Sequence, residues 1–427
     1  MTVNRIEEDM ENEYQIRDDC RLCLSKDLVE VLRLNPTPPA NEFVAAVTGG
    51  DIPSQSEIPL YLVSCRQCGH VQLPVVVDPE RLFRNYVYVS GTSPVFVDHF
   101  RRYADDMIRR LELVPGDLVV EIGSNDGTLL KFFQEAGMRV VGIDPAKDIA
   151  AKATADGVQT WNEFFTPDTA HRVVKTYGFA SLVIANNVFA HADDLCSIAR
   201  GVKSMLDPRG VFMFENSYLP DVIEKTLFDT VYHEHLSYHS VGPLVRFFQS
   251  VGMSLRDAQR VDTHGGSIRG CAVPHKGDTL VTKDVTDLLA YEAALGLEPG
   301  NRAPFLDLEV RIKALRQRLH EFLATAKSEG KRVAGFGAPA KATTLMYQFG
   351  IGASDLEFIV DDSPLKQGLF TPGKHVPVLP SSAIRELQPD YLVVLAWNFA
   401  DPIIAKNQAF RDAGGKFVVP IPVFRVV

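Results

Sequence analysis

The sequence has no apolar run that approaches the roughly 20 residues needed to cross a bilayer. It has no basic run beyond short pairs such as Arg101-Arg102 and Arg109-Arg110, and its net charge is -10. Nucleic-acid phosphates are bound by clustered Lys and Arg, so a nucleic-acid partner is disfavoured. A small anionic ligand stays allowed, because one or two cations or a helix N-terminus can bind it. The N-terminus is acidic and polar, unlike a signal peptide. We therefore expect a cytoplasmic monomer without membrane contact.

Cysteine is also scarce, with six residues in a chain of 427. Four of the six stand in two Cys-x-x-Cys pairs, which in a reducing compartment indicate metal ligands before disulfides. Two such pairs supply four thiolates, enough for a closed, structural, tetrahedral zinc site. The alternatives are four unrelated cysteines, or His70 in place of one thiolate. The predicted zinc ligands are Cys20, Cys23, Cys65 and Cys68.

The length predicts two or three domains, because one domain usually holds roughly 100 to 200 residues. The N-terminal part has short apolar runs between Pro and Gly and needs a stabilising cross-link. Two later parts alternate strands with helices, which predicts parallel sheets covered by helices. We predict an α/β protein with a zinc-binding domain at 1–85, a Rossmann-like domain at 86–300 and a second one at 301–427.

The expected elements follow from apolar periodicity. In the central part we expect strands at 117–122, 139–143, 180–185 and 210–215, and helices at 95–113, 127–136, 146–156 and 195–206. A helical block at 281–328 follows. In the last part we expect strands at 331–335, 356–360 and 391–395, and helices at 340–349 and 381–387.

A glycine-containing loop follows the first central strand. Its strand ends in Glu121-x-Gly123, and a helix begins near Gly127, so backbone N–H groups can approach a ligand closely. Asp144 ends the next strand, where an acid can accept both ribose hydroxyls of a nucleoside. A Gly-x-Gly-x-x-Gly loop is absent, so the pattern favours S-adenosylmethionine over NAD. The alternative is a structural turn without a ligand.

Acid–base side chains are concentrated just after position 228. Two imidazoles, a carboxylate and a phenol lie within four residues, a set suited to proton transfer. An extended segment would place His233 and His235 on one face, and Tyr232 and Glu234 on the other. The His-Glu-x-x-His pattern of zinc proteases is absent. A cluster of hydrogen-bonded core residues is the alternative, but we favour catalysis.

Three further loops carry candidate residues. His191 follows the strand at 180–185, at the edge where such sheets bind ligands. Arg269 follows a Gly-Gly turn, which could bind an anion or form a plain hairpin. Lys341 opens a helix after the loop Gly335-x-Gly337, an arrangement suited to phosphate, although a structural turn is the alternative.

Taken together, these motifs resemble those of the sugar C-methyltransferases of antibiotic deoxysugar pathways. The resemblance runs over nearly the whole chain. Besides the paired Cys-x-x-Cys, the matching segments are FRNYVYVSGTS (83–93), EIGSNDGTLL (121–130), NNVFAHADD (186–194), DTVYHEHLSYHS (229–240), THGGSIRG (263–270) and GFGAPAKATT (335–344). The resemblance implies a zinc domain, a central class I S-adenosylmethionine-dependent methyltransferase domain and a C-terminal Rossmann-like domain that binds a nucleotide sugar.

The family chemistry is alkylation of the carbon beside a C4 ketone, usually on a dTDP-linked 4-keto-6-deoxyhexose, through an enolate. The resemblance implies His235 as the base, with Tyr232, Glu234 and His191 orienting it or stabilising the enolate. The implied cofactor residues are Tyr88, Glu121, Gly123, Asp126, Asp144 and Asn187. The implied substrate residues are Tyr86, His264, Arg269 and Lys341.

One segment departs from the family pattern. The sequence at 215–218 is Glu-Asn-Ser-Tyr, where a more apolar turn is expected, so the sugar pocket is altered. The motifs do not distinguish methylation at C3 from methylation at C5. The rival functions are a zinc-ribbon nucleic-acid methyltransferase, a binding protein without turnover, and an NAD-linked sugar oxidoreductase. The last lacks its glycine loop and a Tyr-x-x-x-Lys pair.

Overall fold

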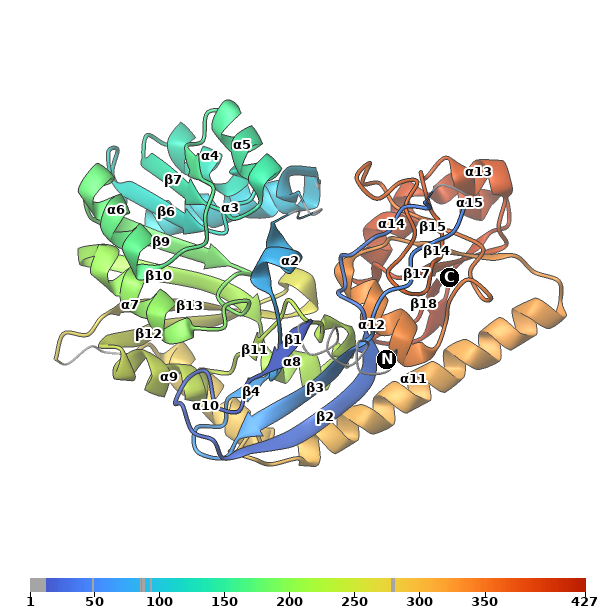
Figure 1. The fold of residues 1–427 in the computed structure, drawn as a ribbon, viewed down its shortest axis with the longest axis horizontal. Helices are drawn as coiled ribbons and strands as arrows, with labels where there is room; N and C mark the ends of the chain where they lie inside the picture. The colour runs from blue at the N-terminus through green and yellow to red at the C-terminus, as the bar shows by residue number, and fades with distance from the viewer. Residues whose placement is uncertain (1–12, 48–49, 85, 87–88, 93, 278–280) are drawn as a thin grey trace, which may run out of the picture.

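The computed structural model describes residues 13–427 except 48–49, 85, 87–88, 93 and 278–280. A central α/β domain and a C-terminal α/β domain stand side by side, and N-terminal strands run beneath both (Figure 1). No helix in the described part of the chain is long and apolar enough to span a membrane.

The N-terminal part forms an antiparallel sheet that recruits a strand from much later in the chain. Its order is β11-β4-β3-β2. The strands are β2 (Leu28–Thr37), β3 (Ile58–Cys65), β4 (Val71–Gln72) and β11 (Ser237–Tyr238). A separate pair joins β1 (Tyr14–Ile16) and β5 (Val75–Val77), and α2 (Pro79–Phe83) follows. Because β11 pairs with β4, the segment just before residue 237 is tied to the N-terminal sheet.

The central sheet has the order β12-β13-β10-β9-β6-β7-β8. The five strands β10, β9, β6, β7 and β8 are parallel to one another. The β12–β13 hairpin pairs antiparallel with β10 and forms one edge of the sheet. The strands are β6 (Leu118–Ile122), β7 (Arg139–Ile143), β8 (Thr160–Trp161), β9 (Ala180–Asn186), β10 (Leu206–Ser217), β12 (Met253–Val261) and β13 (Ser267–Pro274).

Helices cover both faces of this sheet, and consecutive residues of a central strand such as β6 are therefore all buried. Val119 packs in one core with α3 (Pro94–Leu111) and α4 (Thr128–Glu135). Val120 faces the opposite core, which includes α6 (Pro167–Tyr177) and α7 (Leu195–Met205). The remaining helices of this part are α5 (Lys147–Ala155), α8 (Leu219–Glu224), α9 (Val241–Ser250) and α10 (Lys283–Ala294).

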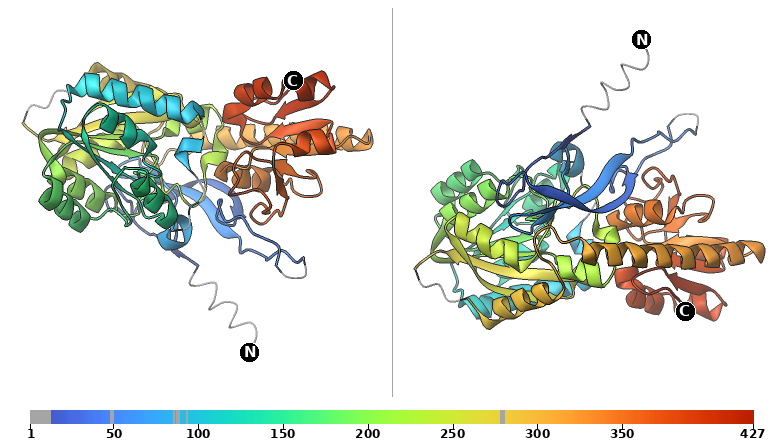
Figure 2. Two further views of the ribbon diagram at one scale, coloured as in Figure 1. Left: turned by 90° about the horizontal axis from the view of Figure 1, so that it is seen from above. Right: turned by 90° about the horizontal axis from the view of Figure 1, so that it is seen from below.

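The C-terminal sheet has the order β16-β15-β14-β17-β18-β19, parallel except for β19. Its strands are β14 (Val333–Phe336), β15 (Ile359–Val360), β16 (Val378–Leu379), β17 (Tyr391–Val394), β18 (Lys416–Val419) and β19 (Arg425–Val426). Its helices are α12 (Ala340–Phe349), α13 (Ala383–Leu387), α14 (Ala400–Lys406) and α15 (Gln408–Asp412). The long helix α11 (Ala303–Ser328) runs beneath this domain (Figure 2).

One hydrophobic core joins the N-terminal sheet to the C-terminal domain. Leu32 of β2, Phe228 before the acid–base segment, Leu308 of α11 and Leu345 of α12 all belong to it. The N-terminal sheet therefore packs against both the C-terminal domain and the segment that precedes β11.

The predicted α/β architecture is confirmed, and most predicted elements agree within two residues. The helical block at 281–328 is two helices, because Gly296 and Gly300 adopt positive φ angles of 73° and 75° between them. The strand predicted at 356–360 is only Ile359–Val360, since a turn at 353–355 is followed by an irregular segment with a bend at 357. The strand predicted at 210–215 extends over the whole of β10.

Candidate active site

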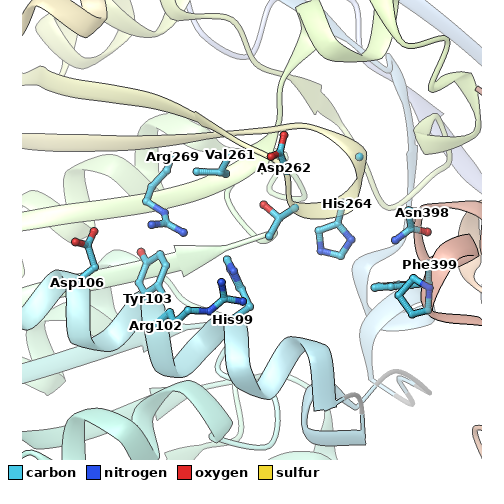
Figure 3. Close-up of a pocket in the computed structure, with 13 residues that line it drawn as sticks. His99, Arg102, Tyr103, Asp106, Val261, Asp262, His264, Arg269, Asn398 and Phe399 are labelled. Carbon is cyan, nitrogen blue, oxygen red and sulfur yellow. The ribbon is translucent and has the colours of Figure 1, made fainter. Parts of the chain in front are cut away.

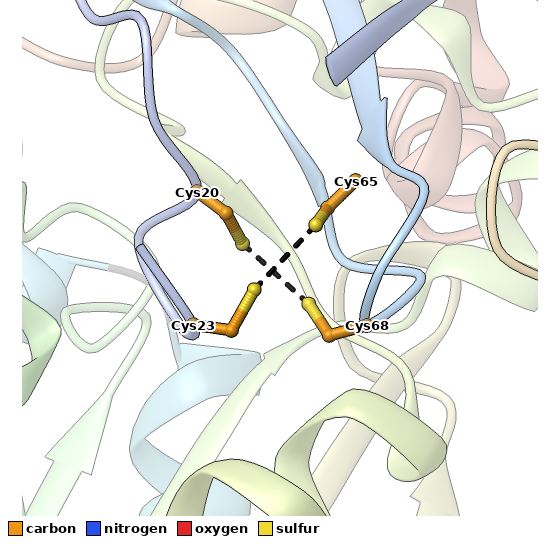
Figure 4. Close-up of side chains that lie close together, drawn as sticks. All are labelled: Cys20, Cys23, Cys65 and Cys68. Carbon is orange, nitrogen blue, oxygen red and sulfur yellow. Dashed lines mark hydrogen bonds between the residues drawn. The ribbon is translucent and has the colours of Figure 1, made fainter. Parts of the chain in front are cut away.

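The two Cys-x-x-Cys pairs meet at one point beside the N-terminal sheet (Figure 4). All four Sγ atoms lie within 4.8 Å of one another, and the Cys20–Cys68 and Cys23–Cys65 Sγ distances are each 3.5 Å. Sulfur atoms bound to a tetrahedral zinc ion at about 2.3 Å lie about 3.8 Å apart, so this cluster fits a closed zinc site. His70 is not part of the cluster, and its Nε2 lies 3.2 Å from Ser237 Oγ instead.

The predicted cofactor residues lie at the carboxyl ends of β6, β7 and β9. The strand order reverses between β6 and β9, which is where open α/β sheets bind ligands. Gly123 has a φ of 70°, and a Cβ atom there would lie 2.2 Å from Val188 Cγ2, so no side chain fits. The Asp144 carboxylate is buried and accepts the Asn125 and Ala146 backbone N–H groups, each at 2.8 Å.

One buried carboxyl oxygen at this edge of the central sheet accepts no hydrogen bond from the described residues. Glu121 is buried, its Oε2 has no partner among the described residues, and burial raises the pKa of its carboxyl well above the ordinary value. Asp126 accepts the Gly91 backbone N–H at 3.0 Å. The Asn187 amide donates to His264 Nε2 at 3.3 Å. A buried, unpaired carboxylate oxygen fits a cationic group such as the amino group of S-adenosylmethionine. Tyr88, also assigned to this site, lies outside the described residues.

His235 and Tyr232 form a half-buried pair. His235 Nδ1 donates to the Thr230 carbonyl oxygen at 2.8 Å, which leaves Nε2 as the acceptor for the Tyr232 hydroxyl, also at 2.8 Å. Burial lowers the pKa of His235 to about 4, so the imidazole is neutral at pH 7. The His191 ring lies 5.0 Å from the His235 ring, and its Nε2 is buried without a partner among the described residues. In this tautomer the proton is on Nδ1 and Nε2 keeps its lone pair, which is the state in which an imidazole can accept a proton.

The segment forms a turn and is not extended, so His233 and His235 do not share a face as they would in an extended segment. The His235 backbone N–H donates to the Tyr232 carbonyl oxygen at 2.9 Å, which closes a turn and places their two rings 4.0 Å apart. His233 points away, with its Nε2 3.2 Å from the Pro59 carbonyl oxygen. The turn is more stable than an extended segment because it gives the buried backbone N–H and C=O groups hydrogen-bond partners.

Glu234 faces a second polar cluster. Its carboxylate accepts the Tyr86 hydroxyl at 2.9 Å and the Asn41 amide at 2.7 Å. Burial raises the pKa of Glu234 to about 7, partly offset by these two hydrogen bonds. The predicted residues Glu234 and Tyr86 are thus in direct contact, and Asn41, which sequence reasoning missed, binds the other carboxylate oxygen. Asn41 lies in a proline-rich loop with no motif to single it out.

Lys341 enters the site from the C-terminal domain. Its Nζ lies 4.3 Å from the Trp397 ring centre, is buried, and has no hydrogen-bond partner among the described residues. Burial lowers the pKa of Lys341, and Asp229 opposes the shift. The Trp397 indole N–H donates to Asp229 Oδ2 at 2.6 Å. Sequence reasoning missed Asp229 and Trp397, although Trp397 is one of only two tryptophans in the chain.

A cavity of about 640 Å³ opens beside this cluster, between the central and C-terminal domains (Figure 3). Helix α3 contributes His99, the β12–β13 turn contributes His264, strand β13 contributes Arg269, and the C-terminal domain contributes Asn398 and Phe399. Burial lowers the pKa of His264 to about 3, and the nearby Lys341 charge adds to this. Cavities of this size hold small molecules.

Arg269 is held by a buried carboxylate. Its guanidinium forms an ion pair with Glu215 at 2.7 Å, and Glu215 also accepts the Thr263 hydroxyl at 2.6 Å. Burial alone would raise the pKa of Glu215, but His99, Arg269 and Thr263 together lower it to about 2. The Gly-Gly turn is a plain hairpin, and Glu215, from the segment that departs from the family pattern, fixes the Arg269 side chain beside the cavity.

The two buried glutamates predict opposite effects of a neutral substitution. The pKa is about 7 for Glu234 and about 2 for Glu215, against an ordinary value of 4.5. Each difference corresponds to a change of about 3 kcal/mol in the free energy of unfolding. The contribution of Glu234 to stability is full below pH 4.5 and lost as the pH rises through 7. The contribution of Glu215 is full above pH 4.5 and lost as the pH falls through 2.

At pH 8, Glu234→Gln should therefore raise the free energy of unfolding by up to about 3 kcal/mol, and Glu215→Gln should lower it by a similar amount. Urea unfolding of both variants at pH 8 and pH 5 measures this. The gain of Glu234→Gln should shrink at pH 5, while the loss of Glu215→Gln should persist. Shifts of the same sign at pH 8 would contradict the assigned environments.

Comparison with known proteins identifies the three parts of the chain. A zinc-binding domain model matches residues 20–83, a methyltransferase domain model matches 97–257, and a C-methyltransferase C-terminal domain model matches 262–422. The C-methyltransferase NovU of Streptomyces niveus is 36% identical over 96% of this chain and 97% of its own.

Two solved structures each cover less than half of the chain. Magnesium protoporphyrin IX methyltransferase from Synechocystis PCC 6803 with bound SAM is 16% identical, covers 42% of this chain and 82% of its own, and has a TM-score of 0.32. PH0226 protein from Pyrococcus horikoshii OT3 is 13% identical, covers 46% of this chain and 98% of its own, and has a TM-score of 0.35. The identity to NovU over nearly the whole length decides the family. The chain belongs to the sugar C-methyltransferase family and is an S-adenosylmethionine-dependent C-methyltransferase with a zinc-binding domain.

Proposed function

We propose that the enzyme methylates a nucleotide-linked, dTDP-type 4-keto-6-deoxy sugar at the carbon next to the ketone, through an enolate. The observation that carries this proposal is the half-buried Tyr232–His235 pair, whose imidazole is neutral and oriented. A carbon acid beside a ketone needs a general base and a group that stabilises the enolate oxygen. The site supplies both within one buried cluster.

His235 receives the proton. Because its Nδ1–H is held by the Thr230 carbonyl, Nε2 is the basic nitrogen. The Tyr232 hydroxyl is hydrogen-bonded to His235 Nε2 and can relay the proton. The hydroxyl oxygen takes the proton from the sugar carbon while the hydroxyl proton moves to His235 Nε2. The imidazolium then releases that proton to solvent, which restores the base.

Lys341 is the group best suited to the enolate oxygen or to a substrate phosphate. Its buried ammonium has no hydrogen-bond partner among the described residues, and an unpaired buried cation favours an anionic ligand. His264 lies beside it, joined to Asn187 of the cofactor edge. A ligand in the interdomain cavity would therefore reach both the C-terminal domain and the cofactor edge.

Bound S-adenosylmethionine supplies an electrophilic methyl group. On this chain, Asp144 would accept the ribose hydroxyls, and Glu121, Gly123, Asp126 and Asn187 would surround the rest of the cofactor. We assign the nucleotide sugar to the cavity between residues 86–300 and 301–427, whose wall includes His264 and Arg269. Tyr86 and Lys341 lie outside that wall, and we assign them to the part of the substrate that extends from the cavity toward the acid–base cluster. The zinc domain, residues 1–85, is structural in this scheme.

The test is incubation with S-adenosylmethionine and a dTDP-4-keto-6-deoxyhexose in deuterated water, read by mass spectrometry. A product that gains one methyl group, with exchange at the acidic carbon, supports the proposal and identifies C3 or C5. Exchange without methylation supports the base and excludes that particular sugar as the methyl acceptor. If the cofactor binds but neither change occurs with any keto-sugar, the sugar assignment fails and nucleic-acid substrates come next.

A further inference from the structure

Arg21 lies inside the first Cys-x-x-Cys knuckle, between Cys20 and Cys23, and is only 1% exposed. A charged side chain is rarely buried to this extent unless it is paired. Burial lowers the pKa of Arg21 to about 10, which still leaves the guanidinium charged at pH 7. Its backbone N–H also donates to the Gln72 side-chain oxygen at 2.8 Å. The knuckle therefore holds a buried cation in a defined place.

The Arg21 guanidinium contacts segments that are far apart in the sequence. Nη1 donates to the Leu73 carbonyl oxygen at 2.7 Å and to the Leu236 carbonyl oxygen at 3.3 Å. Nε donates to Asp193 Oδ1 at 3.0 Å, and Nη2 lies 2.9 Å from the same oxygen. One planar group thus fixes three acceptors on three segments.

Two of those acceptors adjoin the proposed catalytic histidines. Leu236 is the residue after His235, and Asp193 is two residues after His191. The segments also bind each other, because the Leu236 backbone N–H donates to the Ala190 carbonyl oxygen at 2.9 Å. The His191 and His235 rings lie 5.0 Å apart at this junction.

We propose that Arg21 is a positioning residue that transmits the rigidity of the zinc knuckle to the two histidine segments. The inference rests on the proposed function for its catalytic consequence, but not for its structural one. The flanking thiolates fix the Arg21 backbone, and the guanidinium fork fixes Leu236 and Asp193 relative to it. His235 consequently keeps its place beside His191 without a direct bond to the zinc domain.

Lysine cannot replace this arginine, because its single ammonium lacks the planar fork that reaches three acceptors. Arg21→Lys keeps the charge and is the test variant. Arg17→Lys is the matched control. The Arg17 guanidinium donates to the Asp193 carbonyl oxygen at 2.9 Å and lies 3.2 Å from the Asp193 carboxylate. Its partners are Asp193 and Asp19, and Leu236 is not among them. Three readouts are compared with wild type: bound zinc, hydrogen–deuterium exchange of peptides over 187–194 and 232–238, and kcat against KM.

In zinc-loaded Arg21→Lys we expect faster amide exchange in both peptides, unchanged exchange in α12, and unchanged zinc content. We expect kcat to fall about 10- to 100-fold with little change in KM for S-adenosylmethionine, because small displacements of a base cost rate more than binding. Arg17→Lys should leave kcat and exchange over 232–238 near wild type, because Arg17 is bonded to Asp193 and Asp19 and not to Leu236. Any faster exchange in this control should be confined to 187–194, where Arg17 binds the Asp193 carbonyl oxygen. Unchanged exchange in both peptides overturns the proposal.

Faster exchange with normal turnover has a different meaning. The positioning by Arg21 would stand, and the assignment of catalysis to the histidine segments would fail. If Arg21→Lys does not fold, Asp193→Asn is the second variant, because its side chain is 40% exposed and better tolerates the loss of charge. Faster exchange confined to the same peptides supports the proposal, and no change overturns it.

Discussion

Replacing His235 by alanine is expected to lower kcat by about 10²- to 10⁴-fold, the usual contribution of a positioned general base. The affinity for S-adenosylmethionine should stay within about twofold, because no hydrogen bond joins His235 to the described residues of the cofactor edge. Methyl transfer is measured by mass spectrometry, and cofactor binding by calorimetry. Exchange of the sugar proton in deuterated water should be lost together with transfer.

The matched control is His233→Gln, two residues away in the same turn. His233 is fully buried, whereas His235 is half-buried, and the His233 Nε2 faces the Pro59 carbonyl of the N-terminal sheet. The substitution should therefore lower stability and leave kcat of the folded fraction near wild type. If His235→Ala turned over normally, or if both variants lost activity alike, His235 would not be the base. A rate loss confined to His235→Ala, with exchange lost as well, assigns proton abstraction to it.

Replacing Cys20 or Cys65 by serine is expected to remove the zinc ion and a large part of the stability. Closed zinc sites contribute folding free energy outright, and the loss of several kcal/mol corresponds to a fall in Tm of about 10 °C or more. Each of these thiols lies 3.5 Å from a thiol of the other pair, so one substitution opens the whole site. Zinc content is measured by atomic emission, and Tm by calorimetry.

Cys196→Ser is the control, because Cys196 is partly buried but lies outside the thiol cluster. It should keep its zinc and its Tm within a few degrees. A stable, active Cys20→Ser protein would show that zinc is dispensable for the fold. Loss of activity with full zinc and an unchanged Tm would instead give this cysteine a role in chemistry. The expected order is loss of folded protein first, with activity lost only as the fold is lost.

The acid–base cluster illustrates how far sequence reasoning reaches. The residue types at 232–235 indicated proton transfer, since an imidazole beside a phenol and a carboxylate has few other uses. Their geometry did not follow, because an extended segment and a turn place the side chains differently. The turn is selected by backbone partners such as the His235 N–H to Tyr232 carbonyl bond, within a core that also holds α12. His235 thus joins Tyr232 and His191, whereas Glu234 joins Tyr86 and Asn41.

Local patterns in the sequence determined the α/β class, the paired thiol ligands and the glycine loop after β6, because each depends on neighbours within a few residues. Only the tertiary structure brought Asp229 to Trp397, and Arg21 to Leu236 and Asp193. These contacts join residues more than 160 positions apart. The apolar periodicity of a sequence does not predict such contacts, because they depend on how whole domains pack around a shared core.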